Sequence, residues 1–222
     1  MKKEKINIDE RYFEHEEFSS NHKSNQNNYF RALKETFYNE WSSLNSFIDV
    51  GCRQGYLMDY FYQDNPNRII QGMDYFTWGK KLWDKNHWIQ ENYQQHDLRD
   101  TLRNTEWLKV INKNKLFDLV NCTEVGEHID PDYCDVFLDN LASITNKYLI
   151  ISWSPDNIEN GASDPRHQHV NALDKEDFYN KMNEFNFNIK NKLTDELVKN
   201  CKKYYAPSWY VSNAISVWEL NK

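Results

Sequence analysis

The chain has 222 residues, enough for one sizeable domain with a core of its own. Its 27 basic and 34 acidic residues give a net charge of −7, which disfavours a nucleic acid as the main partner, because a polyanion requires a basic field. The four cysteines are scattered without metal-binding spacing, and no apolar run reaches the roughly 20 residues of a membrane span. We therefore expect one cytoplasmic domain over residues 1–222, in which residues 1–45 form a helical and loop extension.

The first predicted elements surround a glycine-containing turn. Residues 19–28 are polar and are predicted as a loop, whereas residues 29–38 have apolar side chains at helical spacing and predict an amphipathic helix. The apolar run 46–50 predicts the first strand, and a helix is expected to follow Gly55.

The rest of the chain alternates between strand and helix patterns. Predicted strands and helices follow in the order strand 68–73, helix 80–86, strand 88–96, strand 117–122, a helix opened by Asp130 and Pro131, strand 148–153, helix 174–185, strand 188–193 and strand 214–220. Strands that alternate with helices predict an α/β fold with a mostly parallel sheet and helices on both faces.

The turn between the first strand and its helix has the features of a nucleotide-type site. Asp49 ends the apolar run, and Gly51 and Gly55 bracket a tight turn where backbone can approach a ligand closely. Asp74 ends the next apolar run, at a spacing that suits a carboxylate bound to a ribose diol.

Four stretches in chain order resemble motifs of the class I S-adenosylmethionine-dependent methyltransferases. Residues 49–55 resemble the acid-x-Gly-x-Gly-x-Gly loop, 72–75 the second strand with its ribose acid, and 96–98 the end of the third strand. Residues 117–129, with Glu-Val and then Glu-His-Ile, closely resemble the fourth strand and loop of the small-molecule branch. The resemblance implies a Rossmann-like, doubly wound sheet of seven strands with an antiparallel last strand, and S-adenosylmethionine as cofactor.

The same resemblance implies a set of cofactor contacts. The loop would bind the methionine part, Asp74 the ribose, Tyr75 and Leu98 the adenine face, and Asp97 the adenine amine. For Asp97 an N-cap of the next helix stays open as an alternative, and for Cys122 plain core packing does. The implied set is Asp49, Gly51, Cys52, Arg53, Gly55, Asp74, Tyr75, Asp97, Leu98, Cys122, Thr123 and Glu124.

Arg53 departs from the family pattern, which has a glycine there. A positive φ at this residue would cost on the order of 1 kcal/mol. Its side chain would lie near the methionine carboxylate of the cofactor, so an ion pair with that carboxylate and an exposed arginine are both open interpretations.

Three histidines are candidates for the catalytic base, since transfer to a hydroxyl requires removal of a proton. They are His128 in the Glu-His-Ile element, and His167 and His169 in a loop after the fifth strand. Alternatively, these histidine side chains cap the local loop or hydrogen-bond to nearby backbone and take no part in catalysis. Asp164 with the loop histidines could instead ligate a divalent ion, but the spacing is not diagnostic and we expect no metal.

The predicted function is transfer of a methyl group from S-adenosylmethionine to a hydroxyl of a small molecule or a sugar (glycan). Aromatic residues near the strand ends would suit a sugar face, although core filling is equally open for each of them: Trp153, Tyr204, Tyr205, Trp209 and Tyr210. The alternatives are an RNA or protein methyltransferase, or a cofactor-binding relative without activity. The sequence leaves the acceptor and the oligomeric state open.

Overall fold

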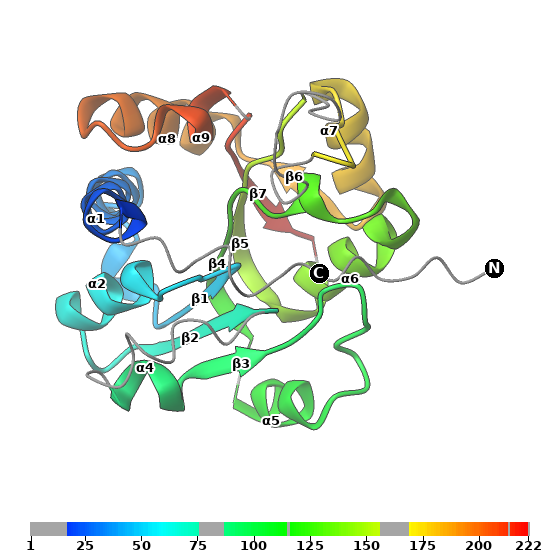
Figure 1. Cartoon of the computed structure of the whole chain (residues 1–222), viewed down its shortest axis with the longest axis horizontal. Coiled ribbons are helices and arrows are strands. Elements are labelled where there is room, and N and C mark those ends of the chain that lie inside the picture. The colour runs from blue at the N-terminus through cyan, green and yellow to red at the C-terminus, as the bar shows by residue number, and fades with distance from the viewer. Residues whose placement is uncertain (1–16, 76–86, 115, 156–168, 213, 222) are drawn as a thin grey trace.

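The computed structural model describes residues 17–75, 87–114, 116–155, 169–212 and 214–221. Seven strands form one sheet: β1 (Ser46–Val50), β2 (Ile69–Asp74), β3 (Tyr93–Gln95), β4 (Phe117–Cys122), β5 (Thr145–Ile151), β6 (Phe187–Ile189) and β7 (Ser216–Leu220). Their order across the sheet is β3-β2-β1-β4-β5-β7-β6 (Figure 1).

The strand directions confirm the predicted fold class. The first five strands pair in parallel, whereas β7 runs antiparallel to both β5 and β6. The chain passes from β1 outward to β2 and later returns to β4 on the other side of β1. In sheets of this kind ligands bind outside the carboxyl ends of the strands at such a reversal, so the ends of β1 and β4 mark the expected crevice.

Helices cover both faces of the sheet (Figure 1). One face carries α1 (Glu17–Thr36), α2 (Tyr56–Asp64), α4 (His87–Glu91), α8 (Asn191–Lys203) and α9 (Ser208–Ser212), and the other carries α5 (Glu106–Asn114), α6 (Cys134–Ile144) and α7 (Lys175–Glu184). Alternate strand residues divide between the two cores, because successive side chains of a strand point to opposite faces. Phe47 and Leu119 pack under α1 and α2, whereas Ile48 and Val120 pack under α6.

Several sequence predictions are confirmed at the residue level. Strands 46–50 and 117–122 are found with the expected bounds. The Asp174 side chain accepts hydrogen bonds from the backbone N–H groups of Glu176 and Asp177, and so caps α7. Asp130 likewise accepts from the N–H of Asp132, although the element that it opens starts as the 3-10 turn η4 (Pro131–Tyr133) before α6.

Three predictions are wrong. Residues 19–28 form the first turns of α1 and not a loop, because buried side chains such as Gln26 give that polar stretch tertiary contacts. The predicted strand 88–96 is mostly α4 followed by the short β3, and the predicted strand 188–193 stops at Ile189, after which α8 begins. These edge strands are too short for a period of two to identify.

Two further points complete the comparison with the sequence. The helix α5 had no sequence prediction, and the predicted helix 80–86 lies outside the described residues. Within the described ranges, no helix combines the length and apolar character that a membrane crossing requires.

Candidate functional site

The loop after β1 turns through left-handed backbone. Gly51 and Gly55 have φ of 79° and 72°, and Arg53 adopts φ 48° without the freedom of glycine. A Cβ at Gly51 would lie 2.4 Å from Cγ2 of Val125, so the loop contacts the segment after β4 closely. The loop is held to β2, since the N–H groups of Gly51 and Cys52 donate to the carbonyl of Met73 at 2.7 and 3.2 Å. A side chain at position 51 would therefore displace Val125 and strain the left-handed backbone.

Asp74 lies at the end of β2, beside this loop. Its Oδ2 accepts a hydrogen bond from the backbone N–H of Arg53 at 2.9 Å, and its carbonyl accepts one from the Tyr93 hydroxyl at 3.1 Å. The structure therefore brings Asp74 and the glycine loop together, as expected from the sequence.

Asp49 lies at one end of a buried hydrogen-bond chain that passes through Asn121. In the β1–β4 register it lies opposite Asn121, whose Nδ2 donates to Oδ1 of Asp49 at 2.8 Å. Asn121 Oδ1 in turn accepts from the Tyr29 hydroxyl of α1 at 2.8 Å. Burial raises the pKa of Asp49 to about 7, against the lowering effects of the Asn121 hydrogen bond and the Arg53 charge, with Asp74 as a further raising influence. This carboxyl group therefore changes its charge near neutral pH.

Asp97 follows β3 and is already engaged by Arg99. Its Oδ1 accepts from the backbone N–H and from Nε of Arg99 at 3.0 and 2.9 Å, and Oδ2 accepts from Nη2 at 2.8 Å. Asp97 thus caps a turn and not a helix, because the next helix, α5, begins only at Glu106, so the N-cap alternative is wrong. Its contact with adenine stays a prediction. The Arg99 guanidinium lies 5.7 Å from the ring centre of Tyr75, which is 38% exposed, whereas Leu98 is buried.

The residues directly after β4 differ from the expected set. Cys122 has no exposed surface and packs in the core below α6, so its thiol is a core group, which corrects the predicted side-chain role. Glu124 has φ 60°. Its backbone N–H donates to the Ser152 hydroxyl at 2.9 Å, and that hydroxyl donates to Oε1 of Glu124 at 2.7 Å. Thr123 hydrogen bonds to Tyr210, whose hydroxyl also accepts from Gln26 at 3.0 Å.

Glu127, His128 and His169 form a cluster beyond β4. Two of them lie on the 3-10 turn η3 (Gly126–His128), and one ligand-capable atom from each residue lies within 4.8 Å of those of the other two. The two imidazole rings are 5.0 Å apart between centres. The structure therefore brings together two of the three predicted histidines, while His167 and Asp164 lie outside the described residues.

The backbone around this cluster is fixed on both sides. The N–H groups of Val170 and Asn171 donate to the Glu127 carbonyl at 2.9 and 3.1 Å, which holds the segment of His169 against η3. A Cβ at Gly126 would lie 2.4 Å from the Trp153 ring, so the turn packs flat on that indole. Backbone hydrogen bonds and packing therefore hold the two segments of the cluster against each other.

Glu127 was not singled out from the sequence. It has no exposed surface, and neither carboxyl oxygen has a hydrogen-bond partner among the described residues. Burial raises the pKa of its carboxyl group and the charge of Glu124 raises it further, whereas weak contacts with the backbone N–H groups of Glu127 and Val125 and the charge of Arg53 lower it. The spacing Glu-x-x-Glu-His indicates that Glu124 and Glu127 lie close together, because a turn brings residues three apart near each other.

Helix α1 supplies three more residues that sequence reasoning missed: His22, Gln26 and Tyr29. Burial and the Arg53 charge lower the pKa of His22 to about 4, so this imidazole is neutral at physiological pH. The charge of Arg53 thus lowers the pKa of His22, Asp49 and Glu127. The first turns of α1 cover the site, a role that a loop prediction could not reveal.

The expected aromatic lining is only partly present. Trp153 is 1% exposed and donates from Nε1 to the Asn171 carbonyl at 2.6 Å, so it is a core residue and its predicted contact with the acceptor is wrong. Tyr210 is also buried, Tyr205 is 84% exposed, and the Trp209 side chain lies outside the part that the structure describes.

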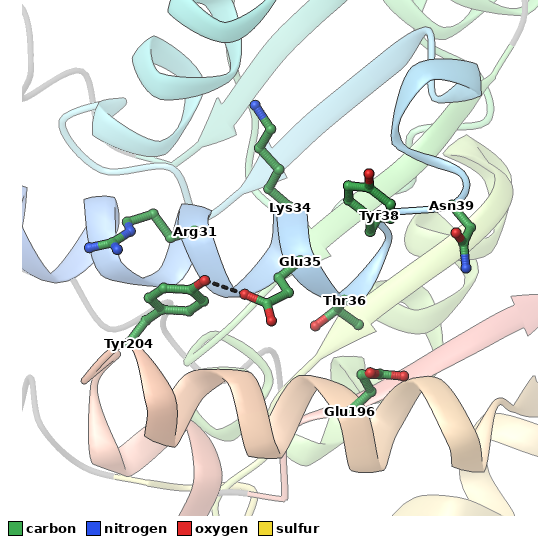
Figure 2. A pocket seen from close by; sticks show the side chains of 8 residues that line it. All are labelled: Arg31, Lys34, Glu35, Thr36, Tyr38, Asn39, Glu196 and Tyr204. Atoms are coloured by element: carbon green, nitrogen blue, oxygen red, sulfur yellow. Dashed lines mark hydrogen bonds between the residues drawn. The ribbon is translucent and has the colours of Figure 1, made fainter.

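A separate hollow of about 660 Å³ lies between the C-terminal half of α1 and α8 (Figure 2). Two of its charged groups are engaged: Glu35 binds Lys203 and the Tyr204 hydroxyl, and the Arg31 guanidinium lies 4.5 Å over the Tyr204 ring. Because ligands of such sheets bind at the carboxyl ends of the strands, the strand-end crevice is the better candidate site.

Comparisons with known proteins agree with this assignment. The profile of a family described as "Methyltransferase domain" matches residues 21–191. Among solved structures, the plantazolicin methyltransferase BpumL in complex with SAH has a TM-score of 0.58 at 15% identity, over 91% of this chain and 87% of that one. The methyltransferase domain of bacterial CtHen1-C has a TM-score of 0.54 at 16% identity, over 88% and 100%.

A third solved structure, an S-adenosylmethionine-dependent methyltransferase from Clostridium acetobutylicum, has a TM-score of 0.54 at 11% identity, over 74% of this chain and 82% of that one. No curated protein sequence matches the chain. At these identities the structural likeness establishes the fold, and the profile establishes the family.

Proposed function

Because the chain belongs to the class I S-adenosylmethionine-dependent methyltransferases, we propose that it transfers the methyl group of this cofactor to a hydroxyl of a small molecule or a sugar. The observation that carries the hydroxyl assignment is the cluster of Glu127, His128 and His169 at the carboxyl end of the sheet. A hydroxyl must lose its proton to become a good nucleophile, and imidazole and carboxylate groups are the usual means.

The residues at the ends of β1 and β2 fit the cofactor. The left-handed loop at Gly51 carries no side chain there, so a ligand can approach its backbone closely. In this proposal the loop and Arg53 hold the methionine carboxylate, and Asp49 accepts from its ammonium group. Asp74 binds the ribose diol, and Tyr75, Leu98 and Asp97 contact the adenine. The bound cofactor supplies an electrophilic methyl group on a sulfonium.

The cluster at η3 would act on the acceptor. In the simplest form of the proposal His128 accepts the hydroxyl proton, and His169 lies beside it at a ring separation of 5.0 Å. His167 stays in the proposal as a further base from the same loop. A positioned histidine contributes typically about 10²–10⁴-fold to such a step.

A small molecule is the first class of acceptor to test. The net charge of −7 disfavours RNA. Support for a sugar is weaker than the sequence indicated, because Trp153 lies in the core. Protein acceptors are therefore the principal alternative.

The test is a screen with methyl-labelled S-adenosylmethionine against panels of hydroxyl compounds, sugars, amines, peptides and RNA. We expect label in a hydroxyl compound, with the methyl group on oxygen by mass spectrometry. Asp74→Ala and His128→Ala should each lower this signal, whereas His96→Ala should leave it unchanged. Label in an amine, a peptide or RNA alone would contradict the hydroxyl assignment.

A further inference from the structure

We propose that Glu127, His128 and His169 form a binding site for a divalent transition-metal ion at the acceptor end of the crevice. The three residues offer two imidazole nitrogens and one carboxylate oxygen, which all lie within 4.8 Å of one another. A first-row ion with bonds of roughly 2.0–2.2 Å holds its ligand atoms up to about 4 Å apart. Small side-chain rotations would therefore close the site on an ion.

Glu127 gives the second, independent observation. Its side chain is fully buried, and neither oxygen has a hydrogen-bond partner among the described residues. A buried carboxylate without a partner is costly, so such groups are ordinarily paired or bound to a metal. A cation between Glu127 and the two imidazoles would remove that cost.

The local charge also favours a cation. Glu124 is close enough for its charge to raise the pKa of Glu127, so two carboxyl groups face a common region. Arg53 provides one opposing positive charge there. A divalent ion bound there would favour the ionised form of both carboxyl groups.

The surroundings hold the ligands in place, as metal sites require. The turn η3 rests on the Trp153 ring at Gly126, and two backbone N–H groups of the segment of His169 bind the Glu127 carbonyl. The two histidines therefore come from segments that are fixed against each other before any ion binds.

The ligand types indicate which ion. Calcium and magnesium prefer oxygen ligands, whereas a set that includes imidazole suits divalent transition-metal ions such as iron and zinc. Three protein ligands leave at least one coordination position for water or an acceptor oxygen. This differs from the expectation of no metal, because the sequence placed Glu127 in no candidate set.

The role of the ion rests on the proposed function. An acceptor hydroxyl bound at the open position would lose its proton more easily, because a bound cation lowers the pKa of an attached oxygen. His128 would then serve as a ligand, and the proton would leave from the ion-bound hydroxyl to water or a nearby base. The acceptor class is accordingly a compound whose reacting hydroxyl can reach a metal.

The test measures metal binding directly. Cobalt(II) is titrated into chelator-treated protein and followed by its visible absorption, and manganese(II) binding is followed by electron paramagnetic resonance. We expect one ion per chain, and a loss of affinity of at least about tenfold in Glu127→Gln, His128→Gln and His169→Gln. The matched control His96→Gln should bind like the unaltered protein, since His96 bonds to the Asp100 carbonyl after β3.

A calorimetric titration with S-adenosylmethionine checks that each variant is folded. The absence of a cobalt spectrum at millimolar excess would overturn the metal site, as would wild-type affinity in all three cluster variants. Methyl transfer that persists after chelation would overturn the role of the ion in activating the hydroxyl, while leaving the proposed function intact. If the ion binds but label never reaches a hydroxyl, the proposed function fails and the metal site remains.

Discussion

The two ends of the crevice satisfy their buried acids in different ways. The donor half, which comprises residues 49–55 and Asp74, pairs its carboxylates with Asn121 and with the N–H of Arg53. The acceptor half, which comprises Glu124, Glu127, His128 and His169, contains a buried carboxylate with no hydrogen-bond partner among the described residues. The donor half is therefore preorganised by contacts within the protein, whereas in our proposal a bound ion completes the acceptor half.

The two halves are linked by one packing contact and by one charge. Gly51 of the donor half lies against Val125, which directly precedes η3. The charge of Arg53 lowers the pKa of Asp49 and of Glu127, one in each half. A change in one half can thus reach the other through a packing contact or through this charge, and variants must separate the two.

The largest expected effect lies in the acceptor half. His128→Ala should lower kcat by about 10²–10⁴-fold, because the hydroxyl is no longer activated, either through a base or through a metal ligand. The measurement is steady-state turnover of the acceptor found in the screen. Turnover close to that of the unaltered protein would show that His128 does not activate the hydroxyl, and His169 or His167 would then be the candidate.

The second effect is a pH dependence that belongs to the donor half. Burial raises the pKa of Asp49 from its ordinary value of 3.8 to about 7, so between these values the folded state holds more protons than the unfolded state. The stability contributed by this group is complete below about pH 4 and is lost as pH rises to about 7, at up to about 1.4 kcal/mol per pH unit.

Asp49→Asn tests this dependence, since an asparagine oxygen can still accept from Asn121. Urea unfolding of both proteins at several pH values should show the variant gaining stability relative to the unaltered protein as pH rises through this window. A difference in unfolding free energy that stays constant with pH would show that Asp49 is not protonated in the folded state.

The third effect is on cofactor affinity. Asp74→Ala should weaken S-adenosylmethionine binding by roughly 1.5–3 kcal/mol, as expected for loss of a charged hydrogen-bond partner. The carboxylate also accepts from the N–H of Arg53, so the loop itself loses a contact. Isothermal calorimetry measures the change, and an unchanged affinity would exclude Asp74 as the ribose ligand.

The smallest effect concerns the contact between the halves. Gly51→Ala places a Cβ 2.4 Å from Val125 at φ 79°, and should lower the unfolding free energy by about 1–2 kcal/mol. In a double-mutant cycle with Val125→Ala, the steric part should disappear and the cost of left-handed backbone, about 1 kcal/mol, should remain. Strict additivity would show that the two residues do not collide.

The sequence predicted the donor half well because that half is local. An acid at a strand end, two glycines around a turn and a second acid after the next strand are visible in the order of the residues alone. The predicted positions of Gly51, Gly55 and Asp74 are therefore the positions at which the structure forms the loop and its carboxylate partner.

The acceptor half was harder to predict because it depends on burial and on contacts distant in sequence. His128 and His169 are 41 residues apart and meet only because the backbone of the second segment bonds to Glu127. The missing partners of Glu127 are a tertiary property, and no pattern of residue types reports them. The polar first turns of α1 were missed for the same reason, since Gln26 and Tyr29 find their partners on α9 and β4.

The most direct test of the division into two halves is a calorimetric titration of S-adenosylmethionine into the unaltered protein, Asp74→Ala and His128→Ala, combined with turnover of the same samples. The account predicts that the unaltered protein binds, that Asp74→Ala binds about 10–150-fold more weakly, and that His128→Ala binds normally while losing turnover. Absence of binding to the unaltered protein, or an equal loss of affinity in both variants, would contradict it.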